Sequence, residues 1–159
     1  TDLVDVTSLV GDGDGDGISD AAEAISSAGA KGWYIDFSTK GEKVLSEALT
    51  FNGVVIFTTY VPPDSTVVSG DCTPAAGSSR IYAMKVEDGM PFADTNYDGS
   101  FDANDRYMDL NNVGIAPDPQ VLLPEVGDPV LITGRDVVEG MLPKLPQTLM
   151  PIKWRHLSD

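Results

Sequence analysis

The fold class of this chain is decided by the stretch Phe51-Asn52-Gly53-Val54-Val55-Ile56-Phe57-Thr58-Thr59-Tyr60-Val61. Asn52-Gly53 predicts a two-residue hairpin turn, because both residues tolerate the positive φ that such a turn requires. Residues 54–61 are all β-branched or aromatic, a composition that favours a central strand. Pro62-Pro63 cannot donate to a sheet ladder and ends the strand. The sequence therefore predicts a mainly β protein built around this hairpin.

Further strand patterns lie on both sides of the hairpin. We expect strands at 33–37, 44–51, 80–86, 121–123, 130–133 and 152–154. Short helices accompany them; one covers Ala21–Ala28 and ends at Gly29. The order predicts an antiparallel meander in a single β-rich domain over residues 1–159. It comprises a lead with a first acidic loop (1–31), the main strands with a second acidic loop (32–123) and closing strands (124–159).

Composition and charge narrow the range of partners. The 159 residues, 42% of them hydrophobic, are enough for one domain with a buried core. The formal net charge of −15 repels phosphate backbones and anionic lipid surfaces, which argues against a nucleic-acid partner. No apolar stretch is long enough to span a membrane. Cations are the favoured ligands, because the acids and amides cluster in two short segments.

The first acidic loop reads Asp-Gly-Asp-Gly-Asp-Gly-Ile-Ser-Asp-Ala-Ala-Glu over residues 12–23. Carboxylates stand at loop positions 1, 3, 5, 9 and 12 with glycine at 6, which is the EF-hand calcium pattern. Alternate side chains of a tight coil point inward, and the glycine allows the reversal that turns a carbonyl inward. The alternative is a flexible acidic linker. The candidate ligands are Asp12, Asp14, Asp16, the carbonyl of Ile18, Asp20 and Glu23.

The second acidic loop, residues 94–105, follows the same pattern. Its twelfth residue is Asp105, whose side chain is shorter than the usual Glu. The alternative is a solvated turn rich in Asp and Asn. We expect two Ca²⁺ ions in all; Mg²⁺ prefers fewer carboxylates, and one His with one Cys cannot build a zinc site. The candidate ligands are Asp94, Asn96, Asp98, the carbonyl of Ser100, Asp102 and Asp105.

Catalytic patterns find little support in this chain. His156 is the only histidine, and neither a Gly-x-Ser-x-Gly nor a phosphate-binding Gly-x-x-x-x-Gly-Lys motif occurs. We therefore expect no enzymatic activity. Cys72 is the only cysteine, so it cannot close an intrachain disulfide. It is a free thiol or pairs with a cysteine outside this sequence.

Three segments together resemble a known family: Gly32–Phe37 followed by Gly41–Glu47, then Phe51–Tyr60, then Ser79–Val86 ahead of the second acidic loop. Their order is similar to the C-terminal propeller region of the type IV pilus tip-associated proteins of the PilC/PilY type. The resemblance implies a partial β-propeller with bound calcium at the bacterial cell surface, the fimbrium, acting in pilus assembly or adhesion. Its partners would be pilus subunits, the rest of a larger pilus protein, or a host or surface ligand.

The same resemblance carries the family's calcium loop onto the second acidic loop, while the first looks like an insertion. The implied ligands are Asp94, Asn96, Asp98, Asp102 and Asp105. The chain departs from the family in two ways. It holds about three propeller blades, too few to close a ring, and it lacks the paired cysteines that members usually carry near Cys72.

Three other interpretations compete with the pilus-tip protein. One is a structural, pilin-like filament subunit that assembles with a separate stem chain. Another is a dockerin-like module, although paired dockerin loops lie close in sequence and these loops begin at residues 12 and 94. The third is a quinoprotein-type propeller enzyme, which would show the absorbance of its cofactor.

Overall fold

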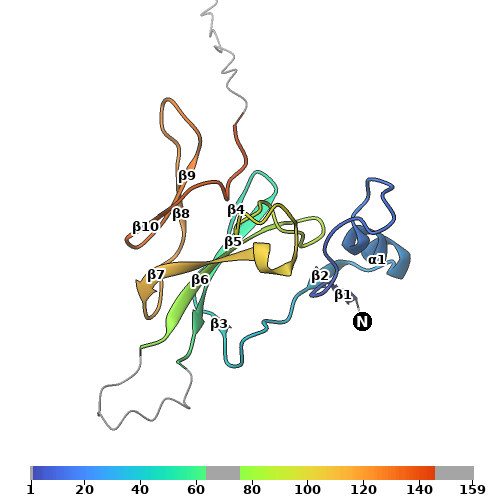
Figure 1. The fold of residues 1–159 in the computed structure, drawn as a ribbon, viewed down its shortest axis with the longest axis horizontal. Helices are drawn as coiled ribbons and strands as arrows, with labels where there is room; N and C mark the ends of the chain where they lie inside the picture. Colours follow the sequence, from blue (N-terminus) through green and yellow to red (C-terminus); the bar gives the residue numbers. More distant parts are fainter. Residues whose placement is uncertain (1, 64–75, 146–159) are drawn as a thin grey trace, which may run out of the picture.

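The computed structural model describes residues 2–63 and 76–145, and its strands form three sheets (Figure 1). This confirms the prediction of a mainly β protein with antiparallel sheets. Strand 152–154 of the prediction, Cys72 and His156 lie outside the described residues. The elements in chain order are β1 (Leu3–Asp5), α1 (Asp20–Ala28), β2 (Gly32–Tyr34), β3 (Lys43–Val44), β4 (Leu49–Phe51), β5 (Val54–Val61), β6 (Ser78–Lys85), the 3₁₀ helix η1 (Ala103–Arg106), β7 (Tyr107–Val113), β8 (Gln120–Leu122), β9 (Val130–Thr133) and β10 (Asp136–Val138).

The predicted hairpin forms between β4 and β5. Phe51 pairs with Val54 across the two-residue turn, in which φ is 45° at Asn52 and 80° at Gly53. Both angles are positive, as a turn that matches the twist of the strands requires. β5 then pairs with β6 along its whole length, and β6 pairs with β7 on its other side. The hairpin of residues 51–61 therefore lies within the five-stranded sheet, and the pairings with β6 and β7 extend the sheet from it.

The predicted single strand 44–51 is wrong, because two short strands, β3 and β4, pair with different parts of β5. Between them the hydroxyl of Ser46 accepts a hydrogen bond from the Thr58 amide at 2.8 Å and donates to the Thr58 carbonyl at 3.4 Å. This side chain therefore takes the place of a backbone partner and interrupts the ladder.

The N-terminal unit, residues 2–36, also differs from the expectation. Its lead contains β1, which pairs in parallel with β2, and β2 ends at Tyr34 rather than at residue 37. The helix prediction is confirmed: α1 ends before Gly29, whose φ of 58° caps it in the left-handed conformation. β7 and β10 were not predicted.

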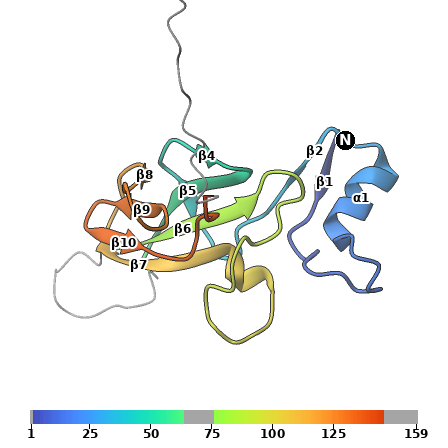
Figure 2. The same ribbon diagram turned by 90° about the horizontal axis from the view of Figure 1, so that it is seen from above.

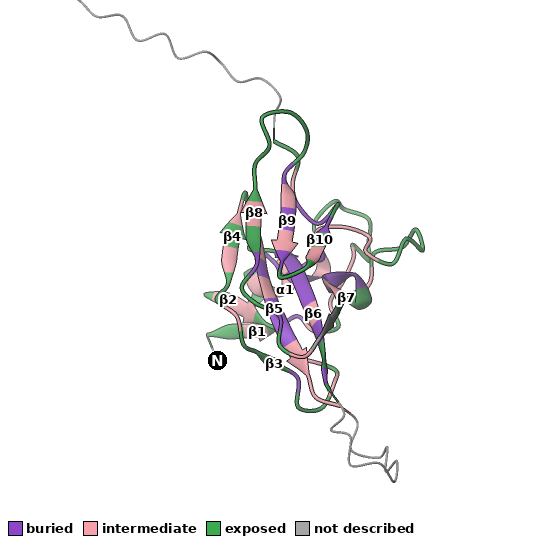
Figure 3. Ribbon diagram, turned by 90° about the vertical axis from the view of Figure 1, so that its left-hand side faces the viewer, coloured by how far each residue is buried: buried purple, intermediate pink, exposed green. Residues whose placement is uncertain are grey.

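The main core lies between one face of the five-stranded sheet and the sheet of β8, β9 and β10. Ile56 and Ala83 pair on β5 and β6 and face the same side. Figure 3 shows the buried residues concentrated along these two strands. No helix in the described part of the chain has the length and apolar composition needed to cross a bilayer. The buried cluster consists of Val54, Ile56, Ile81, Ala83, Leu110, Ala116, Leu131, Val138, Met141 and Leu142.

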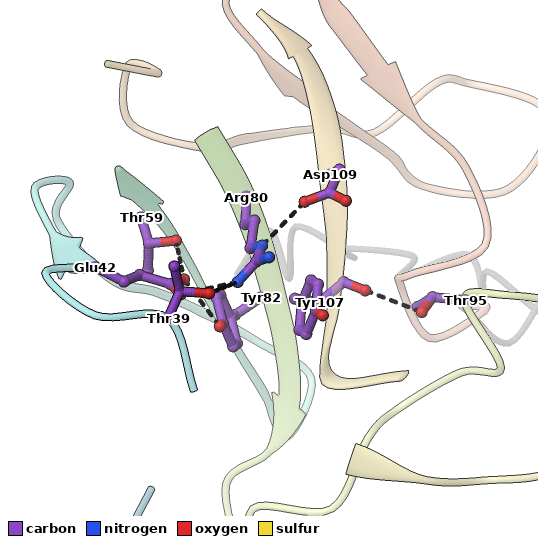
Figure 4. A network of polar contacts seen from close by, with 8 residues as sticks. All are labelled: Thr39, Glu42, Thr59, Arg80, Tyr82, Thr95, Tyr107 and Asp109. Atoms are coloured by element: carbon purple, nitrogen blue, oxygen red, sulfur yellow. Dashed lines mark hydrogen bonds and ion pairs between the residues drawn. The ribbon is translucent and has the colours of Figure 1, made fainter. Parts of the chain in front are cut away.

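The other face of the sheet carries a buried ion pair (Figure 4). The Glu42 carboxylate has no exposed side-chain surface and accepts a hydrogen bond from the Arg80 guanidinium at 2.8 Å. It also accepts from the hydroxyls of Thr59 and Tyr82, at 2.7 and 2.9 Å. Burial first, and then the Glu42 charge, raise the pKa of Tyr82, so its phenol remains a donor. Glu42 is therefore fully satisfied although it lies in the interior.

The N-terminal unit docks onto the turn that follows β6. Trp33 Nε1 donates to the Val86 carbonyl at 2.8 Å, and the indole covers Gly89. A Cβ on Gly89 would lie 2.9 Å from Trp33 Cε3, and the φ of Gly89 is +68°. Only glycine fits here without a shift of the ring or the backbone.

Replacing Glu42 by Ala should destabilise the fold by about 3–5 kcal/mol, because it leaves the Arg80 charge in a largely buried site without its main partner. Asp109→Ala is the matched control. Asp109 pairs with the same guanidinium at 2.9 Å but is 72% exposed, so its loss should cost less than about 1 kcal/mol. Urea unfolding measures both, and equal losses would contradict the assignment.

Gly89→Ala should lower the free energy of unfolding by about 2–4 kcal/mol, since strain at positive φ adds to a clash with Trp33. Gly29→Ala isolates the backbone contribution: φ is +58° there, but no other atom lies within 4 Å of the added Cβ. It should cost about 1–2 kcal/mol. A Gly89 variant no worse than the Gly29 variant would show that the ring does not press on residue 89.

Candidate metal centre

The first acidic loop brings three of its predicted ligands together. Asp12, Asp14 and Asp16 each present a carboxylate oxygen within 4.8 Å of the other two, and all three side chains are exposed. In the described part of the chain this is the only such group of three or more acidic, His or Cys side chains. Like charges this close repel one another, and a divalent cation between them would remove the repulsion.

Backbone amides hold Asp12 at the centre of this loop. Its Oδ2 accepts from the Gly17 amide at 2.8 Å, and its Oδ1 accepts from the Gly15 amide at 2.7 Å. These bonds, that from Gly17 foremost, lower the pKa of Asp12 and keep it charged. Gly15 and Gly17 have φ values of 77° and 92°, which lets the chain coil around the carboxylate.

The later residues of the first loop belong to the start of α1. Asp20 is the first helical residue, and its Oδ1 accepts from the Gly13 amide at 2.9 Å, which closes the loop. Glu23 lies one turn further along the helix. The charges of Asp14 and Asp16, the two largest causes, raise the pKa of Glu23. The close group of carboxylates contains neither Asp20 nor Glu23, so their service as ion ligands stays a prediction. The Ile18 amide donates to Asp16 Oδ1 at 2.8 Å.

The second acidic loop repeats the internal hydrogen bonds of the first. Its Asp94 Oδ2 accepts from the Gly99 amide at 2.9 Å, five residues on, as Asp12 Oδ2 accepts from Gly17. The Asn96 side chain accepts from the Asp98 amide at 2.9 Å, and Asp98 accepts from the Ser100 amide at 2.8 Å. Two segments with different neighbours therefore orient their first, third and fifth side chains in the same way.

One oxygen of the second loop is unsatisfied. Asp94 Oδ1 is buried and accepts no hydrogen bond, and it is the only such side-chain atom in the described residues. Burying a carboxylate oxygen without a hydrogen-bond partner costs free energy. A ligand that donates a hydrogen bond to this oxygen, or a cation that it coordinates, would remove the cost. A hard cation with oxygen ligands fits this atom and its neighbours Asn96 and Asp98.

Asp105 differs from its counterpart Glu23. It is fully buried, with 0% of its surface exposed. Its Oδ1 accepts from the Thr95 amide and its Oδ2 from the Asp102 amide, both at 2.9 Å. The Asp102 side chain in turn caps η1 by accepting from the Asn104 amide at 2.6 Å. Asp105 thus braces the loop from within, and its service as an ion ligand stays a prediction.

Two further residues link the loops to the sheet, and sequence reasoning did not find their roles. Ser19 caps α1 and donates to Asp88 Oδ2 at 2.7 Å. Its position ahead of the helix predicts a cap, but nothing in the sequence points to Asp88. Arg106, next to Asp105, is 3% exposed and donates to backbone carbonyls of residues 6, 7, 9 and 89. No local pattern distinguishes such an arginine from an exposed one.

Figure 2 shows the two loops at separate places, the first in dark blue beside α1 and the second in yellow ahead of β7. Comparisons of the chain with protein-family models, curated proteins and solved structures gave no match. The two candidate ion sites therefore rest on loop geometry alone. The similarity to pilus tip-associated proteins stays a prediction from sequence motifs.

Proposed function

We propose that this chain binds two calcium ions, one in each acidic loop, as an extracellular protein of a type IV pilus system. The observation that carries calcium binding is the repeated internal geometry of the loops, together with the unpartnered Asp94 Oδ1 in the second. Under this proposal both loops are EF-hand-like. The proposed ligands are those expected from the sequence, with Asp105 acting in part by bracing the second loop.

The chemistry of the ligands favours calcium over other divalent ions. Both loops offer oxygen atoms only, and Ca²⁺ takes six to eight of them in flexible geometry. Mg²⁺ demands a tighter octahedron and keeps several waters, so it suits these carboxylate-rich loops less well. The first loop has five carboxylates, and Ca²⁺ has a high enough coordination number to bind several of them at once.

The place of the protein in a pilus rests on the sequence motifs. The proposed role is in filament assembly or adhesion. The sheets would form part of a propeller, and the rest of a larger pilus protein or a partner protein would complete it. Calcium would stabilise the folded state by mass action, because it binds the folded loops and not the unfolded chain. Calcium-binding modules outside cells are matched to the high calcium there.

A pilin-like filament subunit is the second candidate. Large apolar side chains at the end of β8 and in the connection to β9 favour it, since Leu122, Leu123 and Val126 are 54%, 55% and 91% exposed. Packing against a neighbouring subunit would bury such side chains. Cryo-microscopy of native filaments separates the two roles: the pilus-tip protein appears only at filament ends, whereas a pilin-like subunit appears in every helical repeat.

Calcium titration of the chelated protein should give two ions per chain and a higher melting temperature. At a hundredfold excess over Kd each ion stabilises by about 2.7 kcal/mol, or about 5–10 °C in a domain of this size. Magnesium at the same concentration should give a much smaller shift. Calorimetric titration and thermal unfolding monitored by circular dichroism measure the two quantities.

Asp16→Ala and Asp98→Ala test the two loops separately, and each should reduce the stoichiometry to one ion. Glu125→Gln is the control, because it removes an exposed carboxylate outside both loops and should leave two ions bound. If neither loop variant changes the number of ions, the proposed ligands are wrong.

A further inference from the structure

Arg106 connects the end of the second acidic loop to the chain that enters the first. It is the last residue of η1 and directly follows Asp105. Its Nη2 donates to the Val6 and Leu9 carbonyls at 2.6 and 3.1 Å, and its Nη1 donates to the Thr7 carbonyl at 2.5 Å. These carbonyls belong to the segment that leads to Asp12. A single side chain thus fixes the approach to the first loop from the base of the second.

The arginine is bound in a way that few other residues could reproduce. Its Nε donates to the Gly89 carbonyl at 2.9 Å, so the guanidinium serves two segments of backbone at once. Burial lowers the pKa of Arg106, and the nearby charges of Asp88 and Asp5 oppose this effect. The rigid fork of an arginine directs several donors at fixed angles, whereas a lysine offers one flexible point charge. Lysine could keep the charge here but not the set of contacts.

A second contact reaches the first loop from the same turn. Asp88 precedes Gly89, is buried and accepts from the Ser19 hydroxyl at 2.7 Å. Ser19 is position 8 of the first loop and the cap of α1. The first loop is therefore held on both sides, through Arg106 at its entry and through Asp88 at its exit.

We infer that Arg106 couples the two loops, so that calcium bound in one raises the affinity of the other for calcium. This inference rests on the proposed function. An ion that orders the second loop fixes η1 and hence Arg106, which holds the entry of the first loop in its binding shape. The ion that binds the first loop then finds this loop already ordered, so the conformational entropy lost on binding is smaller. Linkage requires the effect to be equal in both directions.

Calorimetric titration of the full chain with CaCl₂ tests the coupling. The product of the two binding constants in the unmodified chain is compared with the product of the single constants of Asp98→Ala and Asp16→Ala. We expect the former to exceed the latter about tenfold, within the usual range of couplings. The same comparison with Arg106→Lys in all three chains should give a ratio of about one.

The outcomes separate the inference from the proposed function. Two ions bound with a ratio of one in the unmodified chain would overturn the coupling and leave calcium binding intact. An undiminished tenfold ratio with Arg106→Lys would also overturn it, since the coupling would then run through other residues. Binding of no calcium by the unmodified chain would overturn the proposed function and the inference with it.

A second measurement needs no change at Arg106, so it holds even if that variant fails to fold. In Asp16→Ala, only the second loop can bind calcium. Calcium should then slow hydrogen exchange severalfold at the Val6 and Leu9 amides, which are bonded to the carbonyls of Tyr34 and Val6. The Asp16→Ala/Asp98→Ala double variant is the control and should show no change. Equal exchange in Asp16→Ala with and without calcium would overturn the coupling.

Discussion

The ladder between β5 and β6 is the interaction on which the rest of this structure depends. Eight residue pairs join the two strands without a break, and their inward side chains supply the centre of the buried cluster. Both ends of the second acidic loop are tied to this ladder: its start follows the turn after β6, and its end runs into β7, which pairs with β6. The turn at Gly89 that receives Trp33 also begins where β6 ends. The N-terminal unit is thus positioned by a ladder to which it does not belong.

The second constraint is the crowding of negative charge, which the two loops meet differently. In the first, three exposed carboxylates lie together, and backbone amides donate hydrogen bonds to Asp12 among them. The second gathers fewer charges, buries Asp105 and leaves one oxygen of Asp94 without a partner. The first loop thus has the higher density of negative charge, whereas the second has more of its carboxylate oxygens fixed in buried positions. The Arg106 guanidinium, which follows the second loop, donates to four backbone carbonyls, three of them in the segment that leads to the first loop.

The sequence predicted those parts of the fold that local chemistry determines. The Asn52-Gly53 turn, the β5 strand and the Gly29 cap each follow from the preferences of adjacent residues, and the structure has all three. The break between β3 and β4 depends on Ser46 reaching a strand twelve residues away, which no local pattern reveals. The parallel pair of β1 and β2 was missed because β1 is only three residues long. For the candidate site, spacing identified the carboxylates, but the roles of Asp88 and Arg106 arise from contacts between distant segments.

The hydrogen bonds of the buried Asp105 have a consequence for the folding of the central sheet. Its two oxygens are bonded to the amides of Thr95 and Asp102, so the connection between β6 and β7 carries its own internal fastening. These bonds join the start and the end of the connection within the polypeptide, so they can form together with the pairing of β6 and β7.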